Sequence, residues 1–215
     1  MLDILDNHKI MRNLEVVPND STMFPFVHGS DKTIVALIRP DMKHGPWIAG
    51  GAALAWYEGR PVGLSDIDVF CRNKKQAATL INLFKKYYII SIVVETENAI
   101  TFRVTCVDPI VTNDNWIVQI ITKNYYNSPQ EILNNFDITV CQIVTDGHQY
   151  IMGNNTANHI KTRQLVFNRI QPDLIKRLVK YWAYGFIPSD ELLNSIDDMD
   201  IWNISDHVDY DQLAP

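Results

Sequence analysis

The sequence lacks the long apolar runs and the cysteine patterns that mark several classes of protein. No apolar run approaches the roughly 20 residues that a membrane-spanning helix needs, so no membrane partner is expected. Cys71, Cys106 and Cys141 have no metal-type spacing and lie in strand-like segments, which predicts buried free thiols. The mixed-charge N-terminus has no apolar core of a signal peptide. These features together favour a cytoplasmic protein.

Positive charge is also scarce, and the negative charge is unevenly distributed. The formal net charge is −6, but residues 189–215 contain eight Asp or Glu and no Lys or Arg. The remainder, residues 1–188, has 17 acidic and 19 basic residues and therefore carries about +2. A near-neutral body is not the basic footprint of a general nucleic-acid binder, so nucleic acid is not the expected partner. The acidic tail is a candidate for binding a basic partner.

The hydrophobic patterning predicts an α+β protein. Helices are expected over residues 49–57, 74–88, 128–134, 157–167 and 172–184, and strands over 62–71, 89–95, 99–107, 116–122, 136–145 and 149–152. This order favours a mixed β-sheet with helices packed mainly on one side, followed by a small C-terminal helical part. We expect an irregular N-terminal arm at 1–32, a main domain at 33–155, C-terminal helices at 156–188 and the acidic tail at 189–215.

One short stretch, residues 50–68, contains the candidate metal-binding and phosphate-binding residues. Asp66 and Asp68 are one residue apart in a predicted strand, so their side chains point to the same face. Two close carboxylates repel each other unless a cation lies between them, and Mg²⁺ prefers such oxygen ligands together with substrate phosphates. Upstream, Gly50 and Gly51 precede a helix, where a diglycine turn lets backbone N–H groups approach a phosphate. Metal and phosphate together point to nucleotide chemistry.

This stretch resembles the nucleotidyltransferase superfamily of DNA polymerase β. The resemblance rests on AGG at residues 49–51, a spacer of fourteen residues, and DIDV at residues 66–69. It implies a nucleotidyltransferase-like fold in which Asp66 and Asp68 bind Mg²⁺ or Mn²⁺ and take part in catalysis. It also implies that Gly50, Gly51 and Ser65 bind the nucleotide through its β and γ phosphates.

The superfamily resemblance also implies a third carboxylate on a neighbouring strand, and two positions compete for that place. Asp137 is the first choice for a third catalytic and metal-binding residue, because it stands at the mouth of a predicted strand among apolar neighbours. Alternatively, the strand over residues 117–121 lies beside the aspartates, and Gln119 then occupies the position. An amide oxygen can bind a metal but cannot act as a general base.

Further segments, over residues 118–122, 128–132, 136–139 and 180–186, resemble uncharacterised nucleotidyltransferase-like proteins of large viruses, phages and some bacteria. The resemblances imply metal-dependent transfer of a nucleoside monophosphate from an NTP, with ATP as the first candidate, to a hydroxyl of a protein or small molecule. For a viral or phage protein, the site of action is the host cytoplasm. The alternative is a non-catalytic structural or partner-binding protein, of viral or phage origin, on a degenerate nucleotidyltransferase fold.

Overall fold

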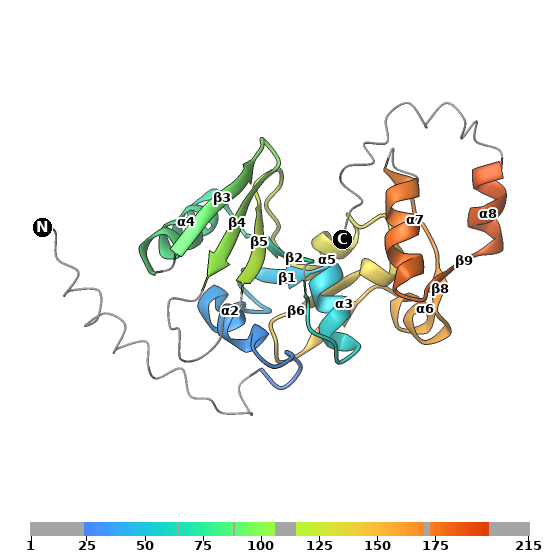
Figure 1. Ribbon diagram of the computed structural model, residues 1–215, viewed down its shortest axis with the longest axis horizontal. Helices are drawn as coiled ribbons and strands as arrows, with labels where there is room; N and C mark the ends of the chain where they lie inside the picture. The colour runs from blue at the N-terminus through green and yellow to red at the C-terminus, as the bar shows by residue number, and fades with distance from the viewer. Residues whose placement is uncertain (1–23, 64, 88, 106–114, 170–172, 198–215) are drawn as a thin grey trace, which may run out of the picture. The chain divides into compact units, whose positions relative to one another are not determined.

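The computed structural model describes residues 24–63, 65–87, 89–105, 115–169 and 173–197. The chain forms two compact units. The first comprises Met1–Phe136 and Cys141–Asn154, and the second comprises Asp137–Val140 and Asn155–Pro215. Figure 1 shows the helices and strands and labels most of them. The sequence-based expectation of a mixed sheet with α-helices is confirmed.

The first unit is built on a seven-stranded sheet with the order β3-β4-β5-β2-β1-β6-β7 (Figure 1). All neighbouring pairs are antiparallel except β2 and β5, which are parallel. The strands are β1 (Trp47–Ala49), β2 (Asp66–Phe70), β3 (Ile89–Glu95), β4 (Ala99–Thr105), β5 (Asn115–Ile121), β6 (Ile143–Thr145) and β7 (Tyr150–Met152). The helices of this unit are α2 (Asp31–Ile38), α3 (Gly51–Tyr57), α4 (Lys74–Tyr87) and α5 (Pro129–Leu133).

The second unit contains helices and a two-stranded parallel sheet. Its elements are η1 (Thr139–Cys141, of which Cys141 belongs to the first unit), α6 (Thr156–Thr162), β8 (Gln164–Leu165), α7 (Leu174–Ala183), β9 (Ile187–Pro188) and α8 (Asp190–Asp197). Gly185, with φ of 84°, follows α7, and its left-handed backbone ends the helix. Within the described residues, no helix combines the length and apolar character that crossing a membrane requires.

The large sheet has two different faces, because alternate residues of each strand point to opposite sides. One face forms the main core with α2, α3 and α4, and its central strands contribute the fully buried Ile67, Val69, Val118 and Ile120. The other face carries a smaller cluster that includes Trp47 of β1, Phe70 of β2, Val144 of β6 and residues of α5. The polar residues of β2 and β5 lie on this second face. The sheet therefore buries one side in the main core, while its second side carries this smaller apolar cluster and the polar side chains of β2 and β5.

A buried carboxylate holds four parts of the first unit together. Asp31, at the start of α2, is only 4% exposed. Its Oδ2 accepts hydrogen bonds from the indole Nε1 of Trp56 at 2.9 Å and from the backbone N–H of Val62 at 3.0 Å. Its Oδ1 accepts a third from Trp116 Nε1 at 3.0 Å. These bonds connect α2, α3, the loop before β2, and β5, and so fix the sheet against its helices.

The single strand expected over residues 136–145 is wrong. The chain forms a bridge at Ile138, the 3₁₀ turn η1, and only then β6. The apolar run contributes to both units: Ile138 and Val140 are buried in the second, Ile143 and Val144 in the first. Thr139 makes two hydrogen bonds to the carbonyl of Val166, from its backbone N–H and its hydroxyl, which holds this segment in the second unit. Period-two hydrophobicity cannot reveal such a change of unit.

The helix expected over residues 157–167 also ends earlier than predicted. Arg163 adopts the left-handed conformation with φ of 57° and caps α6, and β8 begins at the next residue. The Arg163 guanidinium lies 4.8 Å from the centre of the Phe186 ring, and the Arg163 carbonyl accepts a hydrogen bond from Ile187. Tertiary contacts therefore stop a segment whose local pattern is helical. The outer part of the strand expected over residues 99–107 lies outside the described residues.

Candidate functional site

The two aspartates of the sequence motif lie on the open face of the sheet. Asp66 is exposed and Asp68 is half-buried, whereas the intervening Ile67 and the following Val69 are fully buried in the main core. The alternation that the sequence predicts in this strand is thus present. Both carboxylates project from β2 on the same side.

Gln119 is the lateral neighbour of Asp68. β2 and β5 pair in parallel, with Asp68 opposite Gln119. On the far side of β5, Gln119 pairs with Thr101 of β4, and its Nε2 donates a hydrogen bond to Thr101 Oγ1 at 3.1 Å. This is the arrangement that the sequence offered as the alternative to Asp137. Thr101 was missed, although the alternation of AITFRVT over residues 99–105 places it on the polar face.

The diglycine turn lies at the other side of Asp68. Ala49 pairs with Asp68 across β1 and β2, and Gly50 follows at the start of α3 with φ of 73° and ψ of −135°. A Cβ atom at Gly50 would lie 3.0 Å from the Phe136 ring and 3.7 Å from Asp68 Oδ2. The positive φ and the close Phe136 ring together favour glycine at this turn, while the distance to the carboxylate is an ordinary contact.

The backbone N–H groups of the turn have different roles. Gly50 donates its N–H to the carbonyl of Ile143 at 3.0 Å, so this group is occupied within the sheet. The first hydrogen bond of α3 runs from the Leu54 N–H to the Gly50 carbonyl at 3.0 Å, so the N–H groups of residues 51–53 have no acceptor inside the helix. Ser65, half-buried, directly precedes Asp66, and its own N–H donates to Val62 at 3.3 Å. The predicted phosphate contacts of Gly50, Gly51 and Ser65 stay predictions.

Asp137 belongs to the second unit, and its carboxylate has a cationic partner there. Asp137 Oδ1 accepts a hydrogen bond from Arg177 Nη1 of α7 at 2.8 Å, and the Asp137 side chain is 7% exposed. Burial alone lowers the pKa of Arg177, but its hydrogen bond to Asp173 and the charges of Asp137 and Asp173 raise it overall. Arg177 is therefore a permanent cation facing Asp137. The role of Asp137 as third metal ligand stays a prediction.

The side chains on the open face form an oxygen-rich donor set. Asp66 and Asp68 supply carboxylates, and Gln119 supplies an amide oxygen beside them. Among the described residues, no group of three or more His, Cys, Asp or Glu side chains is placed to hold a metal ion. Hard oxygen donors suit Mg²⁺ and Mn²⁺, and these ions keep water and phosphate as further ligands, so two carboxylates and an amide fit a nucleotide-bound cation.

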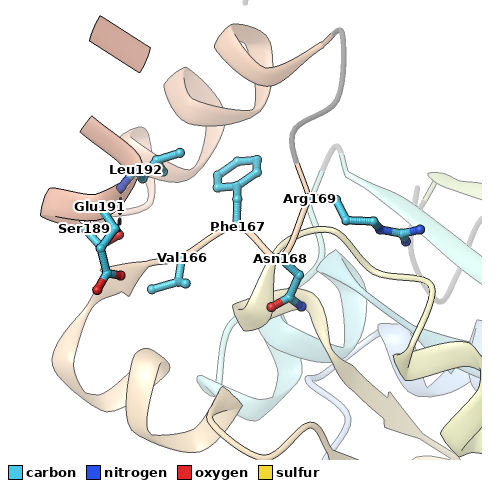
Figure 2. Close-up of a pocket in the computed structure, with 7 residues that line it drawn as sticks. All are labelled: Val166, Phe167, Asn168, Arg169, Ser189, Glu191 and Leu192. Carbon is cyan, nitrogen blue, oxygen red and sulfur yellow. Dashed lines mark hydrogen bonds between the residues drawn. The ribbon is translucent and has the colours of Figure 1, made fainter. Parts of the chain in front are cut away.

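A separate hollow of about 250 Å³ lies in the second unit (Figure 2). Its wall combines apolar and charged side chains, and Ser189 Oγ accepts a hydrogen bond from the Leu192 N–H at 3.3 Å. None of the residues predicted from the sequence to form the site lines it. The lining residues are Val166, Phe167, Asn168, Arg169, Ser189, Glu191 and Leu192.

Comparison with protein families gives one match, over residues 26–163, to the model described as "Gabija anti-defense 2 family protein" (Gad2). The match spans more than half of the chain. The chain belongs to the Gad2 family. Within this Gad2-family chain, the matched region contains the diglycine turn, both aspartates, Gln119 and Asp137. No curated protein matches the sequence.

Solved structures similar to this Gad2-family chain include CCA-adding enzymes. One, in complex with CTP, has a TM-score of 0.59 at 13% identity, over 80% of this chain and 43% of the enzyme. The Thermotoga maritima enzyme, complexed with tRNA, has a TM-score of 0.55 at 14% identity, over 79% and 42%. A complex with ATP has a TM-score of 0.53 at 13% identity. The chain thus spans less than half the length of these enzymes, and identities this low support the fold alone.

Proposed function

We propose that this protein binds a nucleoside triphosphate together with Mg²⁺ or Mn²⁺, and transfers the nucleoside monophosphate to a hydroxyl of a protein or small molecule. ATP is the first candidate for the donor. The observation that carries the proposal is the grouping of Asp66, Asp68 and the Gly50 turn on one open sheet face. The nucleotidyltransferase-like fold and its CTP- and ATP-bound neighbours support the same chemistry.

Each part of this face has a task in such a transfer. Asp66 and Asp68 hold the cation, which supplies positive charge against the triphosphate and the departing pyrophosphate. The turn at Gly50 and Gly51, with Ser65, holds the β and γ phosphates. The acceptor oxygen bonds to the α-phosphorus, the α–β phosphoanhydride bond breaks, and pyrophosphate leaves with the bonding electrons. Asp137 is the sequence-based candidate for taking the acceptor proton and completing the metal site.

A second function, non-catalytic nucleotide or partner binding, is favoured by one specific observation. The residue beside Asp68 on β5 is Gln119, an amide that cannot accept a proton at neutral pH, while Asp137 is paired with Arg177. In this reading the sheet face still binds the metal–nucleotide complex, and the protein acts on a partner without turnover. Membership of the Gad2 family supports a role against the Gabija defence in either case.

Binding and transfer are tested separately. Calorimetric titration with each NTP, with and without Mg²⁺, should give metal-dependent binding that Asp68→Asn abolishes without changing the unfolding transition. Incubation with α-labelled NTPs and cell extract should then label an acceptor with the wild-type protein only. Binding without labelling selects the second function, and wild-type binding by Asp68→Asn refutes the assigned site.

The Gabija connection has its own test. Cells carrying the Gabija defence would be infected with phage while they express the wild-type protein or the Asp68→Asn variant. If nucleotide binding serves the anti-defence role, only the wild-type protein should restore phage growth. Equal restoration by both proteins would show that the role depends on another surface.

A further inference from the structure

We propose that Gln119 is a ligand of the cation held by Asp66 and Asp68, and binds it through the side-chain oxygen Oε1. The inference rests on the proposed function, because it adds a residue to the same metal site. It also assigns to Thr101 the task of positioning that ligand.

The strand register brings the three oxygen donors together. Asp68 and Gln119 are paired residues of adjacent parallel strands, and adjacent strands lie about 4.8 Å apart, so their side chains leave the sheet side by side. Their neighbours along the strands, Ile67 and Val118, are fully buried on the opposite face. Asp66 follows two residues from Asp68 on the same face. The register therefore places an amide directly beside the carboxylate pair.

A hydrogen bond sets the direction of the amide. Gln119 Nε2 donates to Thr101 Oγ1 at 3.1 Å, and Thr101 is 8% exposed on β4. β4 and β2 flank β5 on opposite sides. Because the amide is planar, with its nitrogen and oxygen on opposite sides of the Cγ–Cδ axis, binding of the nitrogen toward β4 turns Oε1 away from Thr101. In the proposed site the oxygen accordingly faces the β2 side, where Asp68 is the paired residue.

The charge of this ligand has chemical consequences. Two carboxylates and a neutral amide carry a charge of −2, which balances one divalent cation. The amide oxygen is a hard donor of the kind that binds such cations. Gln119 has no proton to gain or lose at neutral pH, so it holds the cation but does not deprotonate an acceptor. Gln119 is therefore a cation-binding residue and not a general base.

The test is a direct titration of the purified protein with Mn²⁺, followed by the electron paramagnetic resonance signal of the free ion. Gln119→Ala should weaken Mn²⁺ affinity by about tenfold or more, and Thr101→Val should weaken it by a smaller factor because the amide loses its anchor. Gln119→Glu, which keeps an oxygen at the position and adds charge, should bind at least as tightly as wild type. Gln130→Ala, an exposed glutamine of α5, is the matched control and should leave the affinity unchanged.

The failures of the two proposals are distinguishable. If Asp68→Asn loses Mn²⁺ binding while Gln119→Ala keeps the wild-type affinity, the metal site stands and the assignment of Gln119 is wrong. If Asp137→Asn weakens binding and Gln119→Ala does not, Asp137 is the third ligand, which also overturns the assignment. If Asp68→Asn binds as wild type does, both the metal site and the role of Gln119 fail. Circular dichroism melts identify any variant whose loss of binding reflects unfolding.

Discussion

At the scale of single residues, Gly50 is the position where backbone conformation and the proposed site depend on each other. Its φ of 73° and ψ of −135° are unfavourable for any residue with a Cβ, and that atom would press on Phe136 at 3.0 Å. We expect Gly50→Ala to lower the free energy of unfolding by roughly 1–3 kcal/mol and to weaken metal-dependent nucleotide binding. Urea unfolding and calorimetry measure the two effects.

The adjacent glycine provides a matched control for this prediction. A Cβ at Gly51 meets nothing within 4 Å, and the residue is helical. Gly51→Ala should therefore leave stability unchanged or raise it by up to about 1 kcal/mol, because alanine favours the helix. A Gly50→Ala protein as stable as Gly51→Ala would show that the backbone conformation at Gly50 does not require glycine.

Cys71 is a second residue whose environment predicts its chemistry. It is free and fully buried, and burial raises the pKa of its thiol from 9.0 to about 12. Since the thiolate is the reactive form, Cys71 should resist alkylation in the folded protein and react after unfolding in urea, as peptide mapping would show. The raised pKa also predicts a stability contribution that is complete below 9.0 and is lost as pH rises toward 12. Rapid alkylation of Cys71 in the folded protein would refute the predicted resistance of this thiol.

At the scale of elements, Asp31 connects α2 with the sheet, and its three hydrogen bonds make a clear prediction. Asp31→Asn can keep only one acceptor oxygen, so at least one donor among Trp56, Trp116 and the Val62 N–H loses its partner in the core. We expect a loss of roughly 3 kcal/mol in the free energy of unfolding.

Two tryptophan variants control this prediction. Trp116→Phe removes one donor and should cost less than Asp31→Asn, roughly 1–2 kcal/mol from the hydrogen bond. Trp182→Phe, at a side chain that is 70% exposed, should have little effect on stability. If Asp31→Asn proves as mild as Trp182→Phe, the buried carboxylate does not hold these elements together.

Sequence reasoning located most elements of the first unit because their boundaries have local chemical causes. The short helix α5 begins as expected, with the Ser128 side chain accepting a hydrogen bond from the Glu131 N–H and a proline at the first helical position. The β6–β7 hairpin turns at Asp146-Gly147, where the Asp146 carboxylate accepts from two backbone N–H groups. Neither signal depends on distant residues. The same local pattern placed Asp66 and Asp68 on one face.

The parts that sequence reasoning could not provide depend on strand order and on contacts distant in sequence. No local sequence pattern indicates that β5 pairs with β2. The choice between Gln119 and Asp137 as the neighbour of Asp68 therefore stayed open until the strand register was known. The Arg177 partner of Asp137 is 40 residues away along the chain. Residue types identify candidates for a site, whereas topology decides which of them meet.

At the scale of the whole molecule, the chain alternates between two units, and Asp137–Val140 crosses into the second unit before the first is complete. The Asp137–Arg177 ion pair holds this crossing segment to α7. Asp137 Oδ2 is buried, and no described residue gives it a hydrogen bond, so the pair supplies the carboxylate's one side-chain partner in the described structure. Arg177→Met should therefore leave a buried charge uncompensated and destabilise the second unit by about 2 kcal/mol or more.

Hydrogen exchange measured by mass spectrometry locates that effect. Peptides covering α6 and α7 should lose protection in Arg177→Met before peptides covering β2 and β5, because the lost contact lies in the second unit. Asp173→Asn, which breaks only the exposed pair with Arg177 at 2.7 Å, should cost less than about 1 kcal/mol. Adding Asp137→Asn to Arg177→Met should recover part of the loss, since the buried charge is then removed. A uniform loss of protection along the chain would mean that the two units unfold as one.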